Sequence, residues 1–405
     1  MGAAYLQHIA TAVPAHDIHA AFVAYARQRL HHARERQLFD RMAERSGIAH
    51  RYAALRPGRL DAGEVDADAF YRPGAFPGTA ARMRLYAPQA LDLAVRAVHA
   101  LQATLGPLQP LVATLARVTH LVLVSCTGFQ APGLDVQLVD ALGLNPRVQR
   151  TVVGFMGCAA ALPALRVAQT AVRGDAAALV LVVNVELCSL HLHESNALEP
   201  LLMYLLFGDG ASAALVGAAA HGAELIEFGS QLLPASRELI TWDIGDHGFV
   251  MRLSGAVPAR IAQALAGELA AAEQAGSGGL LRGRRPGDWL WAVHAGGRTV
   301  LDAVQRGLAL PPSALAESRA VLHDVGNVSS ATLMFVLQRW LAKAAPGAAG
   351  LALAFGPGLA VESLHWRMAA APLSCRSAHR WAPRWPPRWP PRSPPPWPRA
   401  APSPS

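Results

Sequence analysis

Short apolar runs alternate with longer amphipathic segments along most of the chain. Between the apolar runs, hydrophobic residues recur every three to four positions and predict helices, the longest at 18–45 and 79–105. Strands that alternate with helices are typical of an α/β protein whose mostly parallel sheets are covered on both faces. The apolar runs that predict buried strands lie at residues 5–13, 120–125, 178–186, 289–293 and 351–355.

The segments between these elements carry turn signals. Residues 57–77 contain several Gly, Asp and Pro residues and are interpreted as a loop. A helix end and a strand are expected within 45–52, and a short β-rich run at 151–153. Residues 207–217 combine a glycine turn with a buried strand, and His221-Gly222 is expected to mark the boundary between two halves of the chain.

One arrangement occurs twice in the sequence. Met156-Gly157-Cys158 precedes an apolar helix and the strand at 178–186, and Val325-Gly326-Asn327 precedes another apolar helix and the strand at 351–355. A polar residue that follows glycine at the corresponding helix start in each half indicates an ancient duplication. We therefore expect two halves, residues 1–220 and 221–367, with these polar residues meeting near the junction.

The last segment, residues 368–405, is rich in Pro, Arg and Trp. Proline blocks helix and sheet, so a disordered low-complexity tail is expected. Arginine beside tryptophan suits phosphates and stacked bases, so one interpretation is a tether to an anionic surface or a nucleic acid. The interpretation that we favour is an appendage without such a role.

The net charge is concentrated in this tail. The chain carries +8, and six arginines without any acidic residue lie between Arg376 and Arg399. Subtracting those six from +8 leaves +2 for the rest of the chain. So small a charge does not indicate a nucleic-acid partner, and we expect none.

Composition excludes several other classes of protein. With 52% hydrophobic and 16% charged residues, the 405-residue chain can bury a large core. No apolar run reaches membrane-spanning length, and the N-terminus lacks a signal pattern, so a cytoplasmic protein is expected. The four cysteines, Cys126, Cys158, Cys188 and Cys375, are widely spaced, which argues against a zinc site or a disulfide framework. We expect no metal and reduced thiols.

Three residues form a candidate catalytic set. Cys158 follows a glycine turn at a helix start, where the free N–H groups and the helix dipole favour thiolate over thiol. His294 ends a strand before two glycines, and Asn327 starts the corresponding helix of the second half. A thiolate attacks a thioester, while imidazole and carboxamide hydrogen bonds stabilise an oxyanion. Taken singly, the three could be a buried cysteine, a core histidine and a helix cap.

Five groups of motifs resemble the type III polyketide synthases, the chalcone synthase family of the thiolase superfamily. The resemblance spans about residues 5–366 and implies the five-layered αβαβα fold of two duplicated halves, and a homodimer. The motifs are Ser125-Cys126-Thr127-Gly128 with Ala131-Pro132-Gly133 and Gly157-Cys158; Leu206-Phe207-Gly208-Asp209-Gly210-Ala211; His294-Ala295-Gly296-Gly297; Gly326-Asn327-Val328-Ser329-Ser330-Ala331; and Phe355-Gly356-Pro357-Gly358.

The resemblance also implies roles for single residues. Cys158 would carry the acyl group, with His294 and Asn327 as decarboxylation and oxyanion partners. Phe207 and Met251 fall on the family's two gating phenylalanines. Substrates would be an acyl-CoA starter and malonyl-CoA, with no further cofactor. The other residues expected to bind substrate are Arg41 and Arg45, which fall on the basic residues that bind CoA phosphates, and Gly296, Gly297, Ser329, Gly356, Pro357 and Gly358.

Several positions depart from the family pattern. Leu38 replaces a third basic residue, Ala295 replaces a proline, and Ala354 replaces the first glycine of a G-F-G-P-G loop. Ala131 stands where plant enzymes carry a methionine that reaches into the partner's cavity. These departures remove no catalytic group. They argue against plant-like chalcone formation and favour a bacterial-type enzyme that makes a pyrone, resorcinol or phloroglucinol-type product.

Two other functions remain open from the sequence. One is an initiating-type β-ketoacyl synthase, which shares the Cys/His/Asn chemistry but performs a single condensation. The other is a non-catalytic binding protein that acts through the basic tail. The histidine motif and the Gly356-Pro357-Gly358 loop favour the polyketide synthase over the first, and the intact catalytic set argues against the second.

Overall fold

A nine-stranded sheet runs through the part of the chain that the computed structural model describes, residues 2–59, 64–275 and 279–370. The strand order is β11-β12-β13-β8-β1-β7-β6-β4-β5. The strands are β1 (Tyr5–Ala12), β4 (His120–Ser125), β5 (Gln149–Gly154), β6 (Leu179–Leu187), β7 (Asp209–Gly217), β8 (Ala223–Leu232), β11 (Leu290–Val293), β12 (Ala349–Gly356) and β13 (Ala360–Met368).

The strand pairing repeats across the two halves of the sheet. In the first half, β6 is parallel to β4 and antiparallel to β7, which is antiparallel to β1. In the second half, β12 is parallel to β11 and antiparallel to β13, which is antiparallel to β8. The halves join where Tyr5 and Leu6 of β1 pair with Glu224 and Ala223 of β8. This repetition agrees with the duplication that the sequence predicts.

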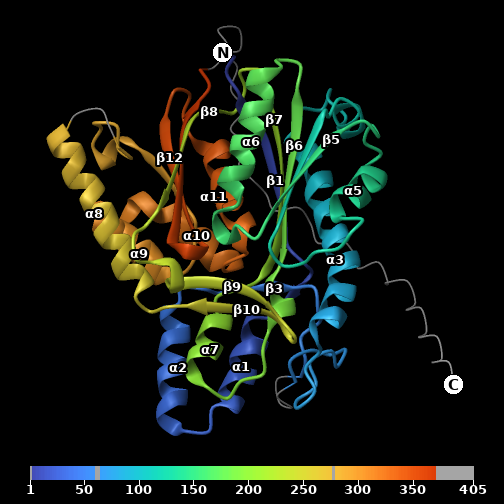
Figure 1. The fold of residues 1–405 in the computed structure, drawn as a ribbon, viewed down its shortest axis with the longest axis vertical. Coiled ribbons are helices and arrows are strands. Elements are labelled where there is room, and N and C mark those ends of the chain that lie inside the picture. Colours follow the sequence, from blue (N-terminus) through green and yellow to red (C-terminus); the bar gives the residue numbers. More distant parts are fainter. Residues whose placement is uncertain (1, 60–63, 276–278, 371–405) are drawn as a thin grey trace. The chain divides into compact units, whose positions relative to one another are not determined.

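Helices separate and cover the two parts of the sheet (Figure 1). Two central helices, α6 and α11, share one apolar core with strands of both halves. Helices α3 and α5 pack on the outer face of the first half, and α8 and α9 on the outer face of the second. The predicted αβαβα layers are therefore confirmed. These helices are α3 (Thr79–Ala100), α5 (Leu134–Leu142), α6 (Ala161–Gly174), α8 (Val257–Ala275), α9 (Arg298–Gly307) and α11 (Thr332–Lys343).

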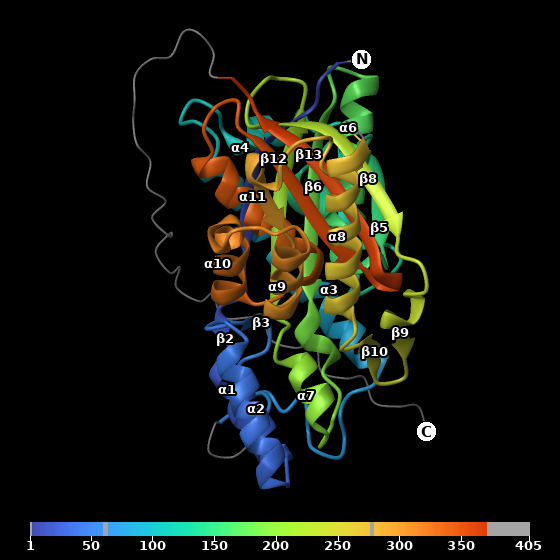
Figure 2. The ribbon, with the colours of Figure 1, turned by 90° about the vertical axis from the view of Figure 1, so that its left-hand side faces the viewer.

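A smaller helical cluster lies at one end of the layers (Figure 2). Its core contains Phe22, Tyr25, Phe39, Tyr71 and Leu201, all buried. The cluster matters for function because α7 leads directly into the turn that carries Phe207. The remaining elements are α1 (His19–Arg29), α2 (Ala33–Arg45), α7 (Leu198–Tyr204), α4 (Leu111–Leu115), α10 (Ala316–Val325), the pair β2 (His16–Asp17) and β3 (Tyr52–Ala53), and the hairpin β9 (Ile240–Gly245) and β10 (Gly248–Leu253).

The helix predicted over 18–45 is wrong as a single element. The chain leaves the helix at Leu30, which is extended and almost fully buried in the helical cluster. The Arg36 guanidinium then donates hydrogen bonds to the carbonyl oxygens of Leu30 and His31, at 2.8 and 3.1 Å. A tertiary contact of one apolar residue thus divides a sequence that reads as one continuous helix into α1 and α2. The strand expected within 45–52 is likewise limited to Tyr52–Ala53.

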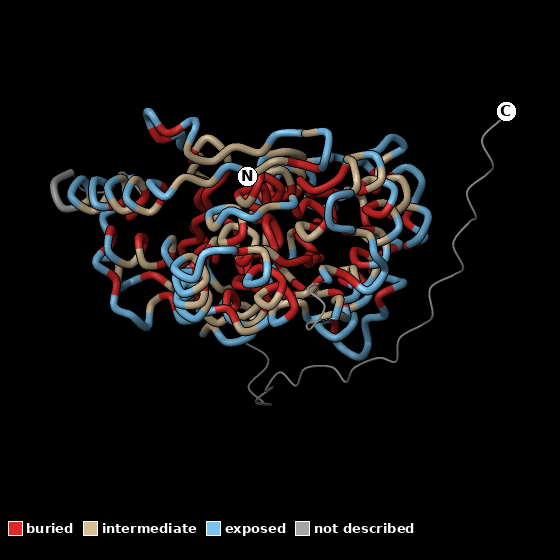
Figure 3. The backbone as a smooth tube through the Cα atoms, turned by 90° about the horizontal axis from the view of Figure 1, so that it is seen from below, coloured by how far each residue is buried: buried red, intermediate tan, exposed pale blue. Residues whose placement is uncertain are grey.

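The buried segments gather in the middle of the layers and the exposed segments line their outside (Figure 3). Among the described helices, none is long and apolar enough to cross a membrane. Strand β13 continues to Met368, where the predicted tail begins. The rest of that prediction falls on residues 371–405, which lie outside the described residues.

Candidate active site

Cys158 lies in a single 3₁₀ turn, Gly157–Ala159, that leads from β5 into α6. Gly157 has a φ of +59°, in the left-handed region that glycine tolerates best. A Cβ atom at this position would lie 2.4 Å from Cδ of Pro357, in the turn after β12. The close approach of the two turns therefore requires glycine, and it brings the predicted Gly356-Pro357-Gly358 loop against the cysteine.

The expectation that the helix start favours the Cys158 thiolate is wrong for this state of the enzyme. Burial raises the pKa of the thiol to about 11, and the nearby Glu186 raises it further, against the opposing effects of Ser329 and Asn327. Its Sγ lies 3.8 Å from the Ser329 hydroxyl oxygen, a long contact. Because desolvation disfavours the charged form more than one helical turn favours it, the thiol is neutral at neutral pH.

Asn327 is held by backbone and side-chain hydrogen bonds on every side. Its Oδ1 accepts from the Ser329 amide at 2.9 Å and from the Thr332 hydroxyl at 3.3 Å. Its Nδ2 donates to the Gly296 carbonyl at 3.2 Å. Since two donors fix Oδ1, the orientation of the amide is set, and the second Nδ2 hydrogen is left for another acceptor. Ser329 itself has a φ of +49°, a strained conformation of the kind that clusters at functional sites.

His294 follows the end of β11, where its backbone N–H donates to the Leu353 carbonyl at 2.8 Å. The side chain is buried, and neither ring nitrogen has a hydrogen-bond partner among the described residues. Burial lowers the pKa of the imidazole to about 3, so the ring is neutral at neutral pH. A buried ring with both nitrogens unpaired is costly, which indicates that a ligand supplies the partner.

These side chains meet in one cavity of about 80 Å³. The cavity joins the two halves, because Cys158 comes from the first half and His294 and Asn327 from the second. Nine of the residues that the sequence predicts for the site line it, namely Cys158, Phe207, Met251, His294, Gly296, Asn327, Ser329, Gly356 and Pro357.

Four predicted substrate-binding residues lie elsewhere. Gly297 precedes α9 and faces Leu206, and Gly358 lies in the turn after β12 with open space beside it. Arg41 and Arg45 are exposed on α2, and the Arg41 side chain donates a hydrogen bond to the Gln37 carbonyl of its own helix. The structure thus does not bring the two arginines into the cavity.

An aromatic wall of this cavity was not predicted. Trp242 donates from Nε1 to the Cys126 carbonyl at 2.8 Å, and the buried His191 stacks on Phe249 with ring centroids 4.3 Å apart. Trp242 and His191 line the cavity together with Cys188. Trp242 lies on β9, whereas Cys188 and His191 lie in one short turn after β6, so no local sequence pattern indicated this wall.

A buried carboxyl group lies behind the cysteine. Glu186 of β6 accepts hydrogen bonds from the Cys126 amide at 3.0 Å, the Thr127 hydroxyl at 2.8 Å and the Ser330 hydroxyl at 2.5 Å. Burial raises its pKa to about 7, although these donors oppose the shift. An acidic residue at the end of an otherwise apolar strand was the sequence signal for this group.

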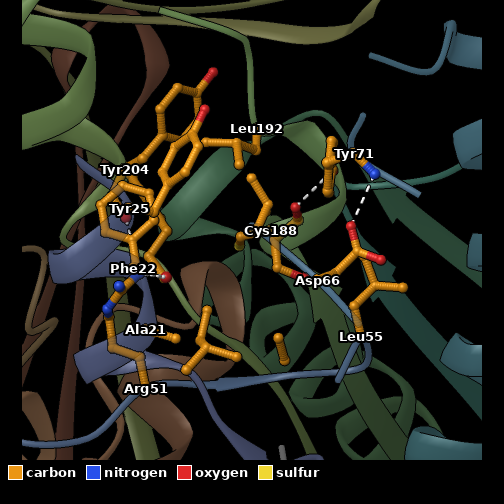
Figure 4. A pocket seen from close by; sticks show the side chains of 15 residues that line it. Ala21, Phe22, Tyr25, Arg51, Leu55, Asp66, Tyr71, Cys188, Leu192 and Tyr204 are labelled. Atoms are coloured by element: carbon orange, nitrogen blue, oxygen red, sulfur yellow. Dashed lines mark hydrogen bonds between the residues drawn. The ribbon is translucent and has the colours of Figure 1, made fainter. Parts of the chain in front are cut away.

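A second cavity, of about 50 Å³, lies on the other side of a partition. Cys188, Tyr204 and Phe207 line both cavities and form that partition. Figure 4 shows Cys188 between Tyr25 and Tyr204 on one side and Tyr71 and Asp66 on the other. The walls are largely apolar and aromatic, so the second cavity suits a hydrophobic group.

Two family models cover nearly all of the described chain. The N-terminal domain of chalcone and stilbene synthases matches residues 1–220, and the C-terminal domain matches residues 224–369. The fold and the Cys/His/Asn cavity define an acyltransferase that handles thioesters. The chain belongs to the chalcone and stilbene synthase family and is a type III polyketide synthase. Enzymes of this family use CoA thioesters as substrates.

Relatives and solved structures agree with this assignment. The alpha-pyrone synthesis polyketide synthase-like Pks18 of Mycobacterium tuberculosis is 35% identical over 342 residues, 82% of each chain. Bisdemethoxycurcumin synthase of Oryza sativa subsp. japonica is 34% identical over 345 residues, 80% of this chain and 82% of the relative. PKS-I from the brown alga Ectocarpus siliculosus superposes with a TM-score of 0.75 at 28% identity, covering 91% of this chain and 99% of its own. The type III polyketide synthase domain of Steely1 from Dictyostelium, at 23% identity and a TM-score of 0.78 over 91% of this chain and 100% of its own, shares the fold.

Proposed function

We propose that the protein loads an acyl-CoA starter onto Cys158, extends it with malonyl-CoA by decarboxylative condensation, and cyclises the product. The observation that carries this proposal is the meeting of Cys158, His294 and Asn327 in one cavity that both halves build. A nucleophile and two uncharged hydrogen-bonding groups in a cavity with largely apolar walls suit thioester chemistry.

Loading requires a proton to leave Cys158. The nitrogens of His294 are unpaired, so one of them accepts the proton as the starter thioester enters. The thiolate attacks the thioester carbon, and the carbonyl oxygen becomes an oxyanion. Collapse of this intermediate breaks the bond to sulfur of CoA, and the departing CoA thiolate takes the proton from His294. The acyl group is then joined to Cys158, and His294 is neutral again.

Decarboxylation needs hydrogen-bond donors rather than a base. When malonyl-CoA loses carbon dioxide, the electron pair of the broken carbon–carbon bond forms an enolate whose charge lies on the thioester oxygen. The free Nδ2 hydrogen of Asn327 and the N–H of neutral His294 can donate to that oxygen. Both groups are uncharged in the cavity and Asn327 is already oriented, so little reorganisation is needed.

Condensation returns the thiol to its starting state. The enolate carbon attacks the Cys158 thioester, a carbon–carbon bond forms, and the cysteine sulfur leaves as a thiolate that takes up a proton from solvent. The extended chain, now on CoA, can reload on Cys158. Repetition gives a polyketide whose enol oxygen can attack the thioester carbonyl and release a pyrone. We propose a pyrone as the first product to seek, because the Pks18 relative is named for alpha-pyrone synthesis.

The size of the starter is limited by the two cavities. We propose that the first cavity, of about 80 Å³, receives a short acyl group. A longer or aryl starter would have to pass Cys188, Tyr204 and Phe207 into the second cavity. We propose that Arg41 and Arg45, exposed on α2, attract the CoA phosphates outside the cavity. No cofactor beyond the CoA thioesters is proposed, and the site of action is the cytoplasm, where thiols stay reduced.

We also propose that the enzyme is a homodimer that forms along β5. This strand is the last in the sheet, and its first four residues, 149–152, are exposed. Val152, Phe129 and Met156 add exposed apolar side chains there, and the Phe129 and Phe155 rings lie 5.1 Å apart. A sheet edge that pairs with no further strand among the described residues, and that is flanked by exposed apolar side chains, is a favourable surface for a second copy. Light scattering on Val152→Arg should show monomer, with Leu108→Arg, an equally apolar exposed site on another segment, as the control.

The experiment that tests the proposed reaction is a single incubation series. Malonyl-CoA with short, aryl and long-chain acyl-CoA starters should yield free CoA, carbon dioxide and triketide or longer pyrones by mass spectrometry. A product that contains one added two-carbon unit, formed only from a carrier-protein thioester, would instead identify an initiating-type ketoacyl synthase.

A further inference from the structure

Arg51 is a buried guanidinium that makes no direct salt bridge. Its side chain is 1% exposed, and among the described residues no carboxylate lies within salt-bridge distance of it. Burial lowers its pKa to about 9, although the more distant carboxylates of Asp17 and Asp209 oppose the shift, so the group remains charged at neutral pH. A buried charge without a direct ion pair costs free energy, so the groups that its hydrogen bonds hold are of interest.

The hydrogen bonds of Arg51 go to the turn that follows α7. Its Nη1 donates to the carbonyl oxygens of Tyr204 and Phe207, at 2.9 and 2.7 Å. Its Nε donates to Nδ1 of His19 at 3.1 Å, and the guanidinium stacks on the Phe22 ring at 4.8 Å. His19 and Phe22 thus fix the orientation of the planar guanidinium. In that orientation it binds the carbonyl oxygens at the two ends of the Tyr204–Phe207 turn.

The same turn is joined to Asn327. The backbone N–H of Asn327 donates to the Leu206 carbonyl at 2.9 Å, and the backbone N–H of Gly208 donates to the backbone carbonyl of Asn327 at 3.0 Å. The residues on either side of Phe207 are therefore both hydrogen-bonded to the backbone of Asn327. On the other side of Asn327, a Cβ atom at Gly326 would lie 2.8 Å from Cγ of Arg51, so the arginine stem packs directly on that backbone.

The held residues are also the wall between the cavities. Tyr204 and Phe207 contribute side chains to both cavities, and Arg51 itself lines the second. Figure 4 shows Arg51 reaching beneath Phe22 toward Tyr204. A shift of the two carbonyls that Arg51 holds would move the Phe207 ring and the Asn327 backbone together.

We propose that Arg51 is a positioning residue, which fixes the Tyr204–Phe207 turn so that Asn327 is aligned for decarboxylation and the partition between the cavities keeps its width. This proposal rests on the proposed function, because it assigns Arg51 to the enolate step and to starter size. It does not extend to acyl transfer at Cys158, which none of the bonds of Arg51 reaches.

Arg82 provides a matched control. It is also a buried arginine, it donates to the Leu190, Leu192 and Pro77 carbonyls at 2.7, 2.8 and 2.9 Å, and it stacks on the Tyr71 ring at 5.3 Å. It lines neither cavity. Replacing either arginine by lysine removes a planar fork and keeps a positive charge, so the structural loss is comparable.

The test compares Arg51→Lys and Arg82→Lys with the natural enzyme below their melting temperatures. Malonyl-CoA decarboxylation in Arg51→Lys should fall in kcat by roughly 10- to 100-fold, with KM within about twofold, because the carboxamide is misaligned rather than removed. Alkylation of Cys158 by iodoacetamide should stay within about twofold, and the ratio of activities on aryl and short starters should change. Arg82→Lys should lose thermal stability but keep the decarboxylation rate; the starter ratio is not compared for this variant, because Arg82 contacts Tyr71 and Leu192 of the second cavity.

Each outcome decides the proposal. If folded Arg51→Lys decarboxylates at the natural rate, or if Arg82→Lys loses as much, the proposal is overturned while the proposed function stands. If the natural enzyme itself does not decarboxylate malonyl-CoA, the proposed function and this inference both fail. Should Arg51→Lys not fold, Phe22→Leu, which loosens the same guanidinium and removes no hydrogen bond, should lower decarboxylation about threefold to tenfold; an unchanged rate overturns the proposal.

Discussion

Gly157 before Cys158 and Gly326 before Asn327 occupy corresponding places in the two halves, and both have positive φ angles, 59° and 69°. Each begins a short turn that feeds one of the two central helices. Each is also crowded, Gly157 by Pro357 and Gly326 by Arg51 and the Leu206 carbonyl. The duplicated scaffold therefore presents one polar side chain from each half to the same cavity.

The two side chains are held very differently. Asn327 has partners for its backbone N–H, its carbonyl, its Oδ1 and one Nδ2 hydrogen, whereas Sγ of Cys158 makes a long contact of 3.8 Å with the Ser329 hydroxyl. A fixed dipole stabilises an oxyanion without reorganisation, which explains the clamp on Asn327. A nucleophile that exchanges a proton for an acyl group has to change partners, which explains the freedom of Cys158. Duplication supplied the positions, and hydrogen bonding then gave them different tasks.

Cys158→Ala should separate condensation from decarboxylation more strongly than any other substitution. Condensation should fall by roughly 10³-fold or more, because no acyl-enzyme can form. Decarboxylation of malonyl-CoA should continue, because His294 and Asn327 remain. Chromatography of acetyl-CoA and of condensed products measures both in one assay. Equal loss of the two activities would mean that the thiol also takes part in enolate formation.

Asn327→Ala makes the reverse change. Decarboxylation should fall by roughly 10²- to 10³-fold, as for removal of one oxyanion donor. Starter loading on Cys158, followed as acyl-enzyme mass, should persist. Asn184→Ala is the control, because this buried carboxamide contacts Ser212 and does not line the cavity. A comparable loss in Asn184→Ala would show that stability, rather than the oxyanion contact, is responsible.

Alkylation of Cys158 in the first half and decarboxylation by His294 and Asn327 in the second half should depend differently on pH. Burial raises the pKa of Cys158 to about 11, so iodoacetamide alkylation of the free enzyme should rise about tenfold per pH unit from pH 7 to pH 9. The pKa of His294 is lowered to about 3, so the ring stays neutral and decarboxylation should be flat with pH over the same range. A thiol that alkylates at a constant rate above pH 7 would contradict the neutral resting cysteine.

The smallest effect concerns the two glycine turns. Gly157→Ala and Gly326→Ala combine a strained φ with atoms closer than 3.0 Å, so each should lower the free energy of unfolding by more than the roughly 1–3 kcal/mol of a backbone outlier alone. Gly143→Ala is the control, because Gly143 has a φ of +61° and open space beside it. Denaturant titration should place both site variants below the control; equal loss in all three would remove the argument for close approach.

Local signals in the sequence predicted an α/β fold with covered sheets and a candidate catalytic set, whereas the five layers were implied by the resemblance to the family. Apolar periodicity and glycine turns identify a helix start wherever it lies, and the repeated turns before Cys158 and Asn327 indicated two halves. Contacts between residues that are distant in the sequence could not be predicted from these local signals. The division of the first predicted helix at Leu30 depends on a buried cluster, and the Trp242 wall depends on a hairpin folding over Cys126.

The pKa values and the surroundings of the charged groups could not be predicted from the sequence either. A helix start beside a cysteine predicted a thiolate, but the pKa of Cys158 is set by its burial and by Glu186, whose place behind it is a tertiary feature. The exposed positions of Arg41 and Arg45 likewise follow from how α2 packs, since Phe39 takes the buried face of that helix. Sequence therefore predicted candidate reacting groups that meet in one cavity, and folding determined their charge and surroundings.

The central claim is that one half carries the acyl group and the other supplies the fixed dipole. Peptide mass spectrometry after brief incubation with a starter acyl-CoA tests it most directly, because Cys126, Cys158 and Cys188 all line the same cavity. The account predicts the acyl mass on the Cys158 peptide alone, in the natural enzyme and in Asn327→Ala alike. Acylation of Cys126 or Cys188, or its absence from Cys158 when Asn327 is replaced, would contradict it.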